Sequence, residues 1–168
     1  MRAFIAIDLP EAVRAGLGRK QAEFRAARES RPNDHISWAR PEGIHLTLKF
    51  LGEISEDQTK QVTESLAALG SFEKFAVEIK GFGFFPDARR PRVFWAGLEA
   101  PPALGELAAQ VEAAMQTLGF APETRPFAPH LTLARFKNPK PQPALEALLK
   151  RQGETGQPVI PAPAGIHL

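Results

Sequence analysis

The sequence has no cysteine among its 168 residues and no long apolar run. The first absence excludes disulfide bonds, thiolate catalysis and cysteine-based zinc sites, and it fits a reducing compartment. No apolar stretch approaches the roughly 20 residues that a membrane-spanning helix needs. Asp8 and Glu11 interrupt the first apolar stretch too early for a signal peptide. We therefore expect a soluble, cytoplasmic protein without a membrane partner.

A net excess of charge is nearly absent too, because 21 basic and 19 acidic side chains leave only +2. This balance is a weak argument for nucleic-acid binding by the surface as a whole. The local distribution says more, since residues 88–98 and 125–144 contain basic side chains and no acidic one. A cluster of basic residues alone is more often part of the solvated surface, but both stretches could bind phosphate groups. The basic residues are Arg89, Arg90, Arg92, Arg125, Arg135, Lys137 and Lys140.

Hydrophobic periodicity and turn residues predict a mixed order of strands and helices. Ser55 and Gln58 have the spacing of a capping box, which opens one of the helices. Because strands and helices do not alternate strictly, the order favours an α+β fold with largely antiparallel sheets and helices on their outer faces. Strands are expected at 2–9, 36–39, 45–54, 75–85, 92–99 and 130–136, and helices at 11–29, 55–69, 101–119 and 143–152.

The tetrapeptide His-Leu-Thr-Leu occurs twice, at 45–48 and at 130–133, each time within a predicted strand. Alternation along a strand puts the histidine and the threonine on one face and the leucines on the other. Each motif is thus a strand with an apolar back in the core and a polar front. Continued alternation would add Lys49 to the front of the first strand and Phe50 to its core side.

Two imidazoles facing each other across a cleft suit acid–base catalysis. Histidine titrates near neutral pH, so one ring can accept a proton while the other donates one. The threonine hydroxyls can donate hydrogen bonds to phosphoryl oxygens. The set matches displacement at phosphorus without a metal or another cofactor.

Other interpretations of these residues remain open. Either motif alone is more often structural, and it is the identical recurrence that favours function. A zinc site would need a third ligand, and no histidine, cysteine or carboxylate lies at ligand spacing near either motif. A non-catalytic RNA-binding surface would use aromatic rings for stacking, although most of them alternate into a core. These rings belong to Phe82, Phe84, Phe85, Phe94 and Trp95.

The paired motifs and their flanks resemble the 2H phosphoesterase superfamily, and within it the RNA 2',3'-cyclic phosphodiesterases, historically called 2'-5' RNA ligases. The resemblance covers residues 1 to about 140. It rests on the stretches FIAIDLP, WARPEGIHLTLKFLGE, GFGFFPDARRPRVFWAGL and RPFAPHLTLARF. It implies a bilobal fold with pseudo-twofold symmetry, in which the two motif strands face a central cleft.

The resemblance also implies metal-independent opening of a terminal RNA 2',3'-cyclic phosphate to a 2'-phosphate, and joining of tRNA halves through a 2'-5' linkage. By resemblance, His45 is the acid that protonates the departing O3' and His130 the base that activates water. Thr47 and Thr132 would hold the phosphoryl oxygens. Arg135 occupies the position of a basic residue that often follows the second motif in this family. Strand alternation, however, puts its side chain on the face of the leucines unless the strand bulges. The motifs being identical, the residues alone do not order the two histidine roles.

The family usually continues after the second motif with a further strand, whereas this chain continues with an atypical, proline-rich tail at 153–168. Pro158, Pro161 and Pro163 argue against a sheet strand there. His167 in the tail and His35 in a polar turn at 31–35 are expected to be inert. We expect residues 1–168 to form one monomeric domain with two lobes. A phosphodiesterase for small cyclic nucleotides and a non-catalytic RNA-binding module remain the alternative functions.

Overall fold

The structure, a computed structural model, describes residues 1–28, 35–152, 159–162 and 166–167, and residues 151 onward by their backbone alone. Two antiparallel sheets organise it: a three-stranded sheet in the order β3-β1-β8 and a five-stranded sheet in the order β2-β6-β5-β4-β7. The predicted α+β class with antiparallel sheets is therefore confirmed. The predicted turn at 31–35 lies, except for His35, outside the described residues.

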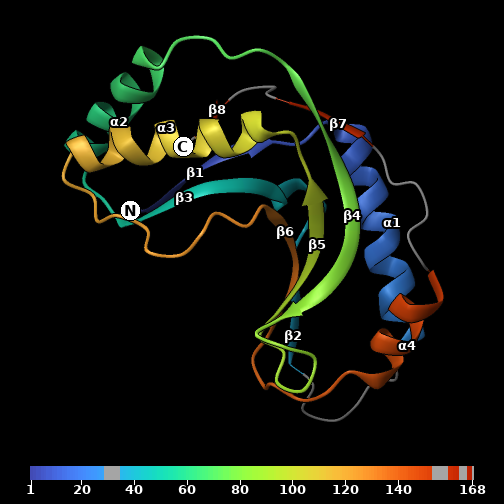
Figure 1. Cartoon of the computed structure of the whole chain (residues 1–168). Coiled ribbons are helices and arrows are strands. Elements are labelled where there is room, and N and C mark those ends of the chain that lie inside the picture. The colour runs from blue at the N-terminus through green and yellow to red at the C-terminus, as the bar shows by residue number, and fades with distance from the viewer. Residues whose placement is uncertain (29–34, 153–158, 163–165, 168) are drawn as a thin grey trace.

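The expected elements are present, with ends shifted by a few residues. Helices cover each sheet, as Figure 1 shows: α2 and α3 lie beside β1 and β3, and α1 and α4 lie beyond β4 and β5. The helices are α1 (Glu11–Ala27), α2 (Glu56–Ala68), α3 (Pro102–Thr117) and α4 (Pro143–Gln152), with a 3-10 turn at Pro41–Gly43. The strands are β1 (Arg2–Asp8), β2 (Ile36–Trp38), β3 (His45–Glu53), β4 (Phe75–Phe85), β5 (Val93–Glu99), β6 (His130–Phe136), β7 (Val159–Ala162) and β8 (Ile166–His167).

Local chemistry explains where helix α2 begins. The Ser55 hydroxyl accepts the backbone N–H of Gln58 at 3.2 Å, and the Gln58 side chain accepts the backbone N–H of Ser55 at 2.9 Å. The predicted capping box is thus confirmed. It satisfies two backbone donors that would otherwise have no partner at the helix start.

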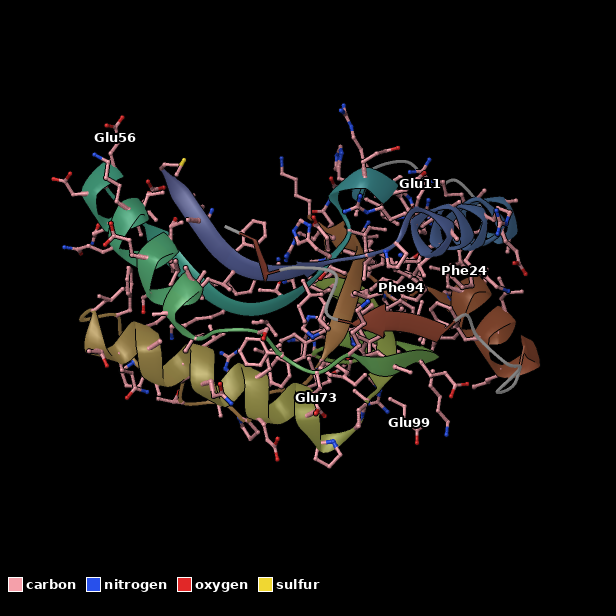
Figure 2. The ribbon with its side chains drawn as sticks, turned by 90° about the horizontal axis from the view of Figure 1, so that it is seen from above. Glu11, Phe24, Glu56, Glu73, Phe94 and Glu99 are labelled. Carbon is pink, nitrogen blue, oxygen red and sulfur yellow. The ribbon has the colours of Figure 1, made fainter. Side chains whose placement is uncertain are left out.

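The core on the back of the five-stranded sheet is aromatic. Phe24 of α1 is fully buried and meets the rings of Phe82 and Phe94 edge-on, at centroid distances of 5.1 and 5.2 Å. Figure 2 shows Phe24 and Phe94 where α1 passes over the strands. Edge-to-face packing adds to the burial of apolar area, so this cluster fixes α1 on the back face of the sheet.

The expectation that the tail forms no strand is wrong. β7 pairs with β4, with Pro161 opposite Ala76, and β8 pairs with β1, with His167 opposite Ala6. Both are edge strands of their sheets. An edge strand needs ladder bonds on one side only, so a proline that lacks an N–H fits where a central strand would exclude it.

Candidate active site

The two His-Leu-Thr-Leu tetrapeptides begin one strand in each sheet, β3 and β6. These two strands contact each other where the sheets meet. The three-stranded sheet thus supplies His45 and Thr47, and the five-stranded sheet supplies His130 and Thr132. In both strands the leucines are buried, as the alternation predicts.

Both tetrapeptides end in the same irregularity, a β-bulge at the second leucine. In β3, Thr47 lies opposite Ala6 and Lys49 lies opposite Ile5, the neighbour of Ala6 in β1, which leaves Leu48 as the extra residue. In β6, Thr132 lies opposite Trp95 and Ala134 lies opposite Phe94, which leaves Leu133 as the extra one. A bulge reverses the alternation of the residues that follow it.

The bulges overturn two expectations and decide a third. Lys49, expected on the front, is buried with 7% of its surface exposed, and Phe50, expected in the core, is 68% exposed. In β6 the reversal buries Ala134 and exposes Arg135. Arg135 lies on the same face as Thr132, because their partners in β5, Val93 and Trp95, are two residues apart and share a face. Phe50 and Arg135 are each the fifth residue after a motif histidine and hold matching places beside the two motifs.

The bulge in β6 is held by a buried glutamine of α1. The Gln21 side-chain amide donates to the carbonyl oxygens of Ala39 at 2.8 Å and Leu133 at 3.0 Å. The backbone N–H of Ala39 donates to the same Leu133 oxygen at 2.9 Å. Gln21 was not among the residues predicted from the sequence, although it lies four residues after Leu17 on the buried stripe of α1. A polar residue within such a stripe is the signal that would have found it.

His45 is half-buried and held between apolar and charged neighbours. Its ring stacks on Phe4 at a centroid distance of 4.6 Å, and Asp8 is its partner across β1. Asp8 in turn binds Arg14 of α1 at 3.3 Å. Burial lowers the pKa of His45, the Asp8 carboxylate opposes that effect, and the Arg14 guanidinium adds to it. Its protonation therefore depends on burial and on two charged neighbours that the motif does not include.

His130 is exposed and oriented by its own backbone. Its Nδ1 lies 2.8 Å from the carbonyl oxygen of Ala128, two residues earlier. Because a carbonyl oxygen only accepts, Nδ1 carries the proton of this bond. The neutral ring then presents an unprotonated Nε2, which is the form that a general base requires.

An ion pair of the buried Lys49 with the partly exposed Glu112 ties the first motif strand to the segment that leads into the second. The Lys49 ammonium binds the Glu112 carboxylate at 2.8 Å and the carbonyl oxygen of Ala121 at 3.0 Å. The other Glu112 oxygen accepts the backbone N–H of Glu123 at 2.9 Å. Burial works against ionisation of Glu112, but the hydrogen bonds from Lys49, Glu123 and Gln116 outweigh it and lower the pKa of the carboxyl. Lys49 thus positions the stretch between α3 and His130.

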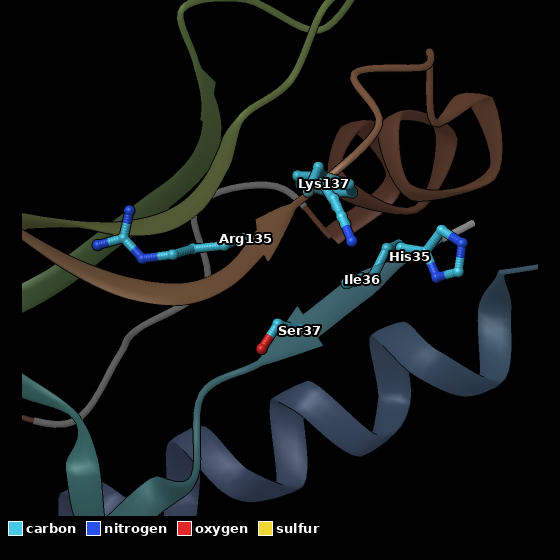
Figure 3. Close-up of a pocket in the computed structure, with 6 residues that line it drawn as sticks. His35, Ile36, Ser37, Arg135 and Lys137 are labelled. Carbon is cyan, nitrogen blue, oxygen red and sulfur yellow. The ribbon is translucent and has the colours of Figure 1, made fainter. Parts of the chain in front are cut away.

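Shallow cavities lie at both ends of β6. One of about 400 Å³ adjoins Arg135, Lys137, Ser37 and His35, which the sequence analysis expected to be inert (Figure 3). Another of about 370 Å³ adjoins Phe127 and, with it, residues 98–102 at the end of β5 and the start of α3. Within the described residues, no group of three or more histidine, aspartate or glutamate side chains lies close enough to hold a metal ion.

Comparison with known proteins identifies the family of this chain. A model of the 2'-5' RNA ligase superfamily matches residues 17–158. The chain belongs to this superfamily. Two curated relatives are named RNA 2',3'-cyclic phosphodiesterase. That of Aeropyrum pernix is 42% identical over 116 residues, 67% of this chain and 64% of the relative. That of Methanothermobacter thermautotrophicus is 33% identical over 150 residues, 89% of this chain and 78% of the relative.

Solved structures of the superfamily show the same fold. TT0787 of Thermus thermophilus matches with a TM-score of 0.71 at 30% identity, over 99% of this chain and 83% of that one. E. coli LigT complexed with 3'-AMP matches with a TM-score of 0.65 at 30% identity, over 80% of this chain and 72% of that one. The predicted fold of the 2H phosphoesterases is thereby confirmed. In the part of the chain that the structure describes, no helix is long and apolar enough to cross a membrane.

Proposed function

We propose that this protein hydrolyses the 2',3'-cyclic phosphate at the end of an RNA strand to a 2'-phosphate. The observation that carries the proposal is the pair of bulged His-Leu-Thr-Leu strands, in which the Nδ1 of His130 is bound to the carbonyl of Ala128. The names of the relatives agree with this enzyme class.

In the proposed reaction, His130 accepts a proton at Nε2 from a water molecule as the water oxygen bonds to phosphorus. The bond from phosphorus to O3' breaks, and protonated His45 donates its proton to O3'. The bond to O2' stays, so the product is a 2'-phosphate. Thr47 and Thr132 donate hydrogen bonds to the non-bridging oxygens, whose negative charge increases during the displacement.

Two further residues complete the proposed site. The Arg135 guanidinium, on the face of Thr132, offsets the charge of the phosphate. Phe50, on the face of Thr47, is an exposed ring 6.2 Å from Phe4 and offers the terminal base a surface for stacking. We assign both to substrate binding rather than to proton transfer.

The same site would join RNA ends if a 5'-hydroxyl took the place of water. His130 would then accept the proton of that hydroxyl, O3' would leave as before, and the product would carry a 2'-5' linkage. The proposed ligation of tRNA halves thus needs no group beyond those of hydrolysis. Water competes with the hydroxyl, so we expect hydrolysis to dominate unless both RNA ends are bound together.

The proposal is tested with an RNA oligonucleotide ending in a 2',3'-cyclic phosphate, incubated with the protein in excess EDTA. We expect a 2'-phosphate product at a rate that EDTA leaves unchanged. A 3'-phosphate product would contradict the assigned leaving group. Binding without any product would favour the non-catalytic module instead.

A further inference from the structure

The face of the five-stranded sheet that carries His130 and Thr132 continues well beyond them. Residues paired across antiparallel strands project from the same face. On β5, Gly97 lies opposite His130, Trp95 opposite Thr132 and Val93 opposite Arg135. On β4, Gly83 lies opposite Trp95 and Phe85 opposite Val93. We call Trp95 and Phe85, which lie on either side of the aliphatic Val93 on this face, the aromatic strip. It runs beside the motif strand.

The Trp95 indole lies flat on this face because two glycines leave room for it. A Cβ atom added to Gly83 would lie 2.7 Å from Cη2 of the indole, and one added to Gly97 would lie 3.2 Å from Cζ3. A side chain at Gly83 would therefore displace the ring, whereas one at Gly97 would overlap the backbone carbonyl oxygen of Lys80 and come only into tight contact with the ring. A ring that lies along a sheet, half-buried, presents its other face outward, as a stacking surface does.

Phe85 extends the strip, and it is not a core residue. Its side chain is 55% exposed, whereas Phe94 is fully buried and Phe82 and Phe84 pack against it. The strand register thus divides the five aromatic residues that the sequence analysis grouped together. Three form the core on the back face, and Trp95 and Phe85 belong to the front. Among the described residues, neither Phe85 nor Trp95 packs against the hydrophobic core, so core packing does not account for the two rings on this face.

Positive charge gathers at the Phe85 end of the aromatic strip, where Arg135 lies opposite Val93. Arg135 is exposed on β6 and Lys137 directly after its last residue, and the cavity of about 400 Å³ between them and β2 adds Ser37 and His35 (Figure 3). We call Arg135 and Lys137 the cationic strip. The turn after Phe85 brings three more arginines, while its carboxylate, Asp87, caps the turn by accepting two backbone N–H groups at 2.8 and 3.0 Å. The three are Arg89, Arg90 and Arg92.

We infer that this face binds the nucleotides that precede the terminal cyclic phosphate, with phosphates on the cationic strip and bases on the aromatic strip. The inference rests on the proposed function for the identity of the terminal group. Single-stranded RNA fits because a row of cations beside a row of rings matches a row of phosphates beside a row of bases. The substrate is then an oligonucleotide of at least two or three nucleotides, and a small cyclic nucleotide is a poor one.

The kinetic test uses substrates of one, two, three and four nucleotides with the same terminal base and a 2',3'-cyclic phosphate. We expect kcat/KM to rise about tenfold with each of the first added nucleotides. Phe85→Ser and Lys137→Gln should each lower the ratio of kcat/KM for the trinucleotide to that for the mononucleotide by at least about fivefold. The matched control for Lys137→Gln is Lys60→Gln, at an exposed site of α2, and the control for Phe85→Ser is Phe85→Tyr, which keeps an aromatic ring at this position; both should leave the ratio unchanged.

Equal kcat/KM for one and three nucleotides would overturn the inference while leaving the proposed function intact. So would a rise with length that survives both variants. Absence of product from every substrate would contradict the proposed function instead, and binding then decides the inference separately.

The binding test uses tryptophan fluorescence, since the chain has only two tryptophans. Trp38 lies on the back face, 6.2 Å from Phe94. A trinucleotide ending in a 2'-phosphate should quench the wild-type emission saturably, and Trp95→Phe should abolish the quenching. Binding detected with labelled RNA but without quenching, or quenching that persists in Trp95→Phe, would overturn the inference.

Discussion

β3 and β6 begin with the same four residues and bulge at the same leucine, yet their histidines lie in different surroundings. His45 is half-buried, stacked on Phe4 and opposite Asp8, whereas His130 is exposed and bound to the backbone carbonyl of Ala128, two residues earlier. Identical motifs thus supply identical groups, and the neighbouring residues differentiate them. The difference supports separate roles, an acid whose charge is set by Asp8 and Arg14 and a base whose tautomer is set by Ala128.

The strongest way to break the comparison is to remove each imidazole. His45→Ala and His130→Ala should each lower kcat/KM by at least about a hundredfold, since general acid–base catalysis contributes factors of this size. Only His45→Ala should also lower the melting temperature, because only that ring packs on a neighbour. Steady-state kinetics and thermal denaturation measure the two effects. A loss of less than tenfold in both variants would contradict acid–base roles.

Removing the buried ammonium of the first motif strand should act on the second motif. Lys49→Met leaves Glu112 without its cation, which costs about 2 kcal/mol of unfolding free energy. It also frees the stretch that positions His130, so kcat should fall with little change in KM. Denaturant unfolding and steady-state kinetics test this.

Lys60→Met, at an exposed site of α2, is the control for Lys49→Met. A loss of stability without any loss of kcat would show that Lys49 is structural only. The Glu112 carboxyl adds an acid dependence, because its lowered pKa gives stability at neutral pH that is lost as the pH falls through that pKa. Lys49→Met should weaken this dependence.

Gln21→Leu should separate the two bulges, since Gln21 contacts only the one in β6. The variant leaves the carbonyl of Ala39 without this donor and weakens the bonding of Leu133, at a cost of about 1 to 2 kcal/mol. Arg135 follows this bulge, so KM should rise for RNA substrates. Urea unfolding and KM are the readouts, and Gln61→Leu at an exposed site is the control. Wild-type stability in Gln21→Leu would show that the amide contributes nothing.

The smallest expected effect is a shift in the pH profile, and its sign is the test. Burial lowers the pKa of His45, Asp8 raises it and Arg14 lowers it further. As the acid, His45 must carry a proton, so kcat/KM falls as the pH rises through its pKa. Asp8→Asn should therefore move the alkaline limb to lower pH, and Arg14→Gln should move it to higher pH. Shifts in the same direction would contradict the assigned role.

Much of this architecture is readable from residue patterns, because each element follows from local chemistry. Alternation predicted the buried leucines of both motifs, and Ser55 with Gln58 predicted the start of α2. The errors come from contacts distant in sequence. A bulge is set by pairing with another strand, so nothing local to HLTLKF revealed that Lys49 is buried and Phe50 exposed. The tail strands likewise depend on the free edges of β4 and β1.

The candidate site divides in the same way. The repeated tetrapeptide identified His45, Thr47, His130 and Thr132 because identical letters recur in two strands. Phe4, Asp8 and Arg14, the neighbours of His45, come from β1 and α1. Their importance appears only when the sheet register is known. Gln21 looks like a surface residue until its amide is seen to bind Leu133.

The central claim is that His45 acts as the acid and His130 as the base. It is tested most directly with an RNA substrate whose cyclic phosphate has sulfur in place of O3', because a thiolate leaves without being protonated. On this substrate the activity of His45→Ala should return to within about tenfold of that of the wild-type protein, while the activity of His130→Ala should stay at least about a hundredfold below it. Rescue of His130→Ala in place of His45→Ala would reverse the two roles and contradict the account.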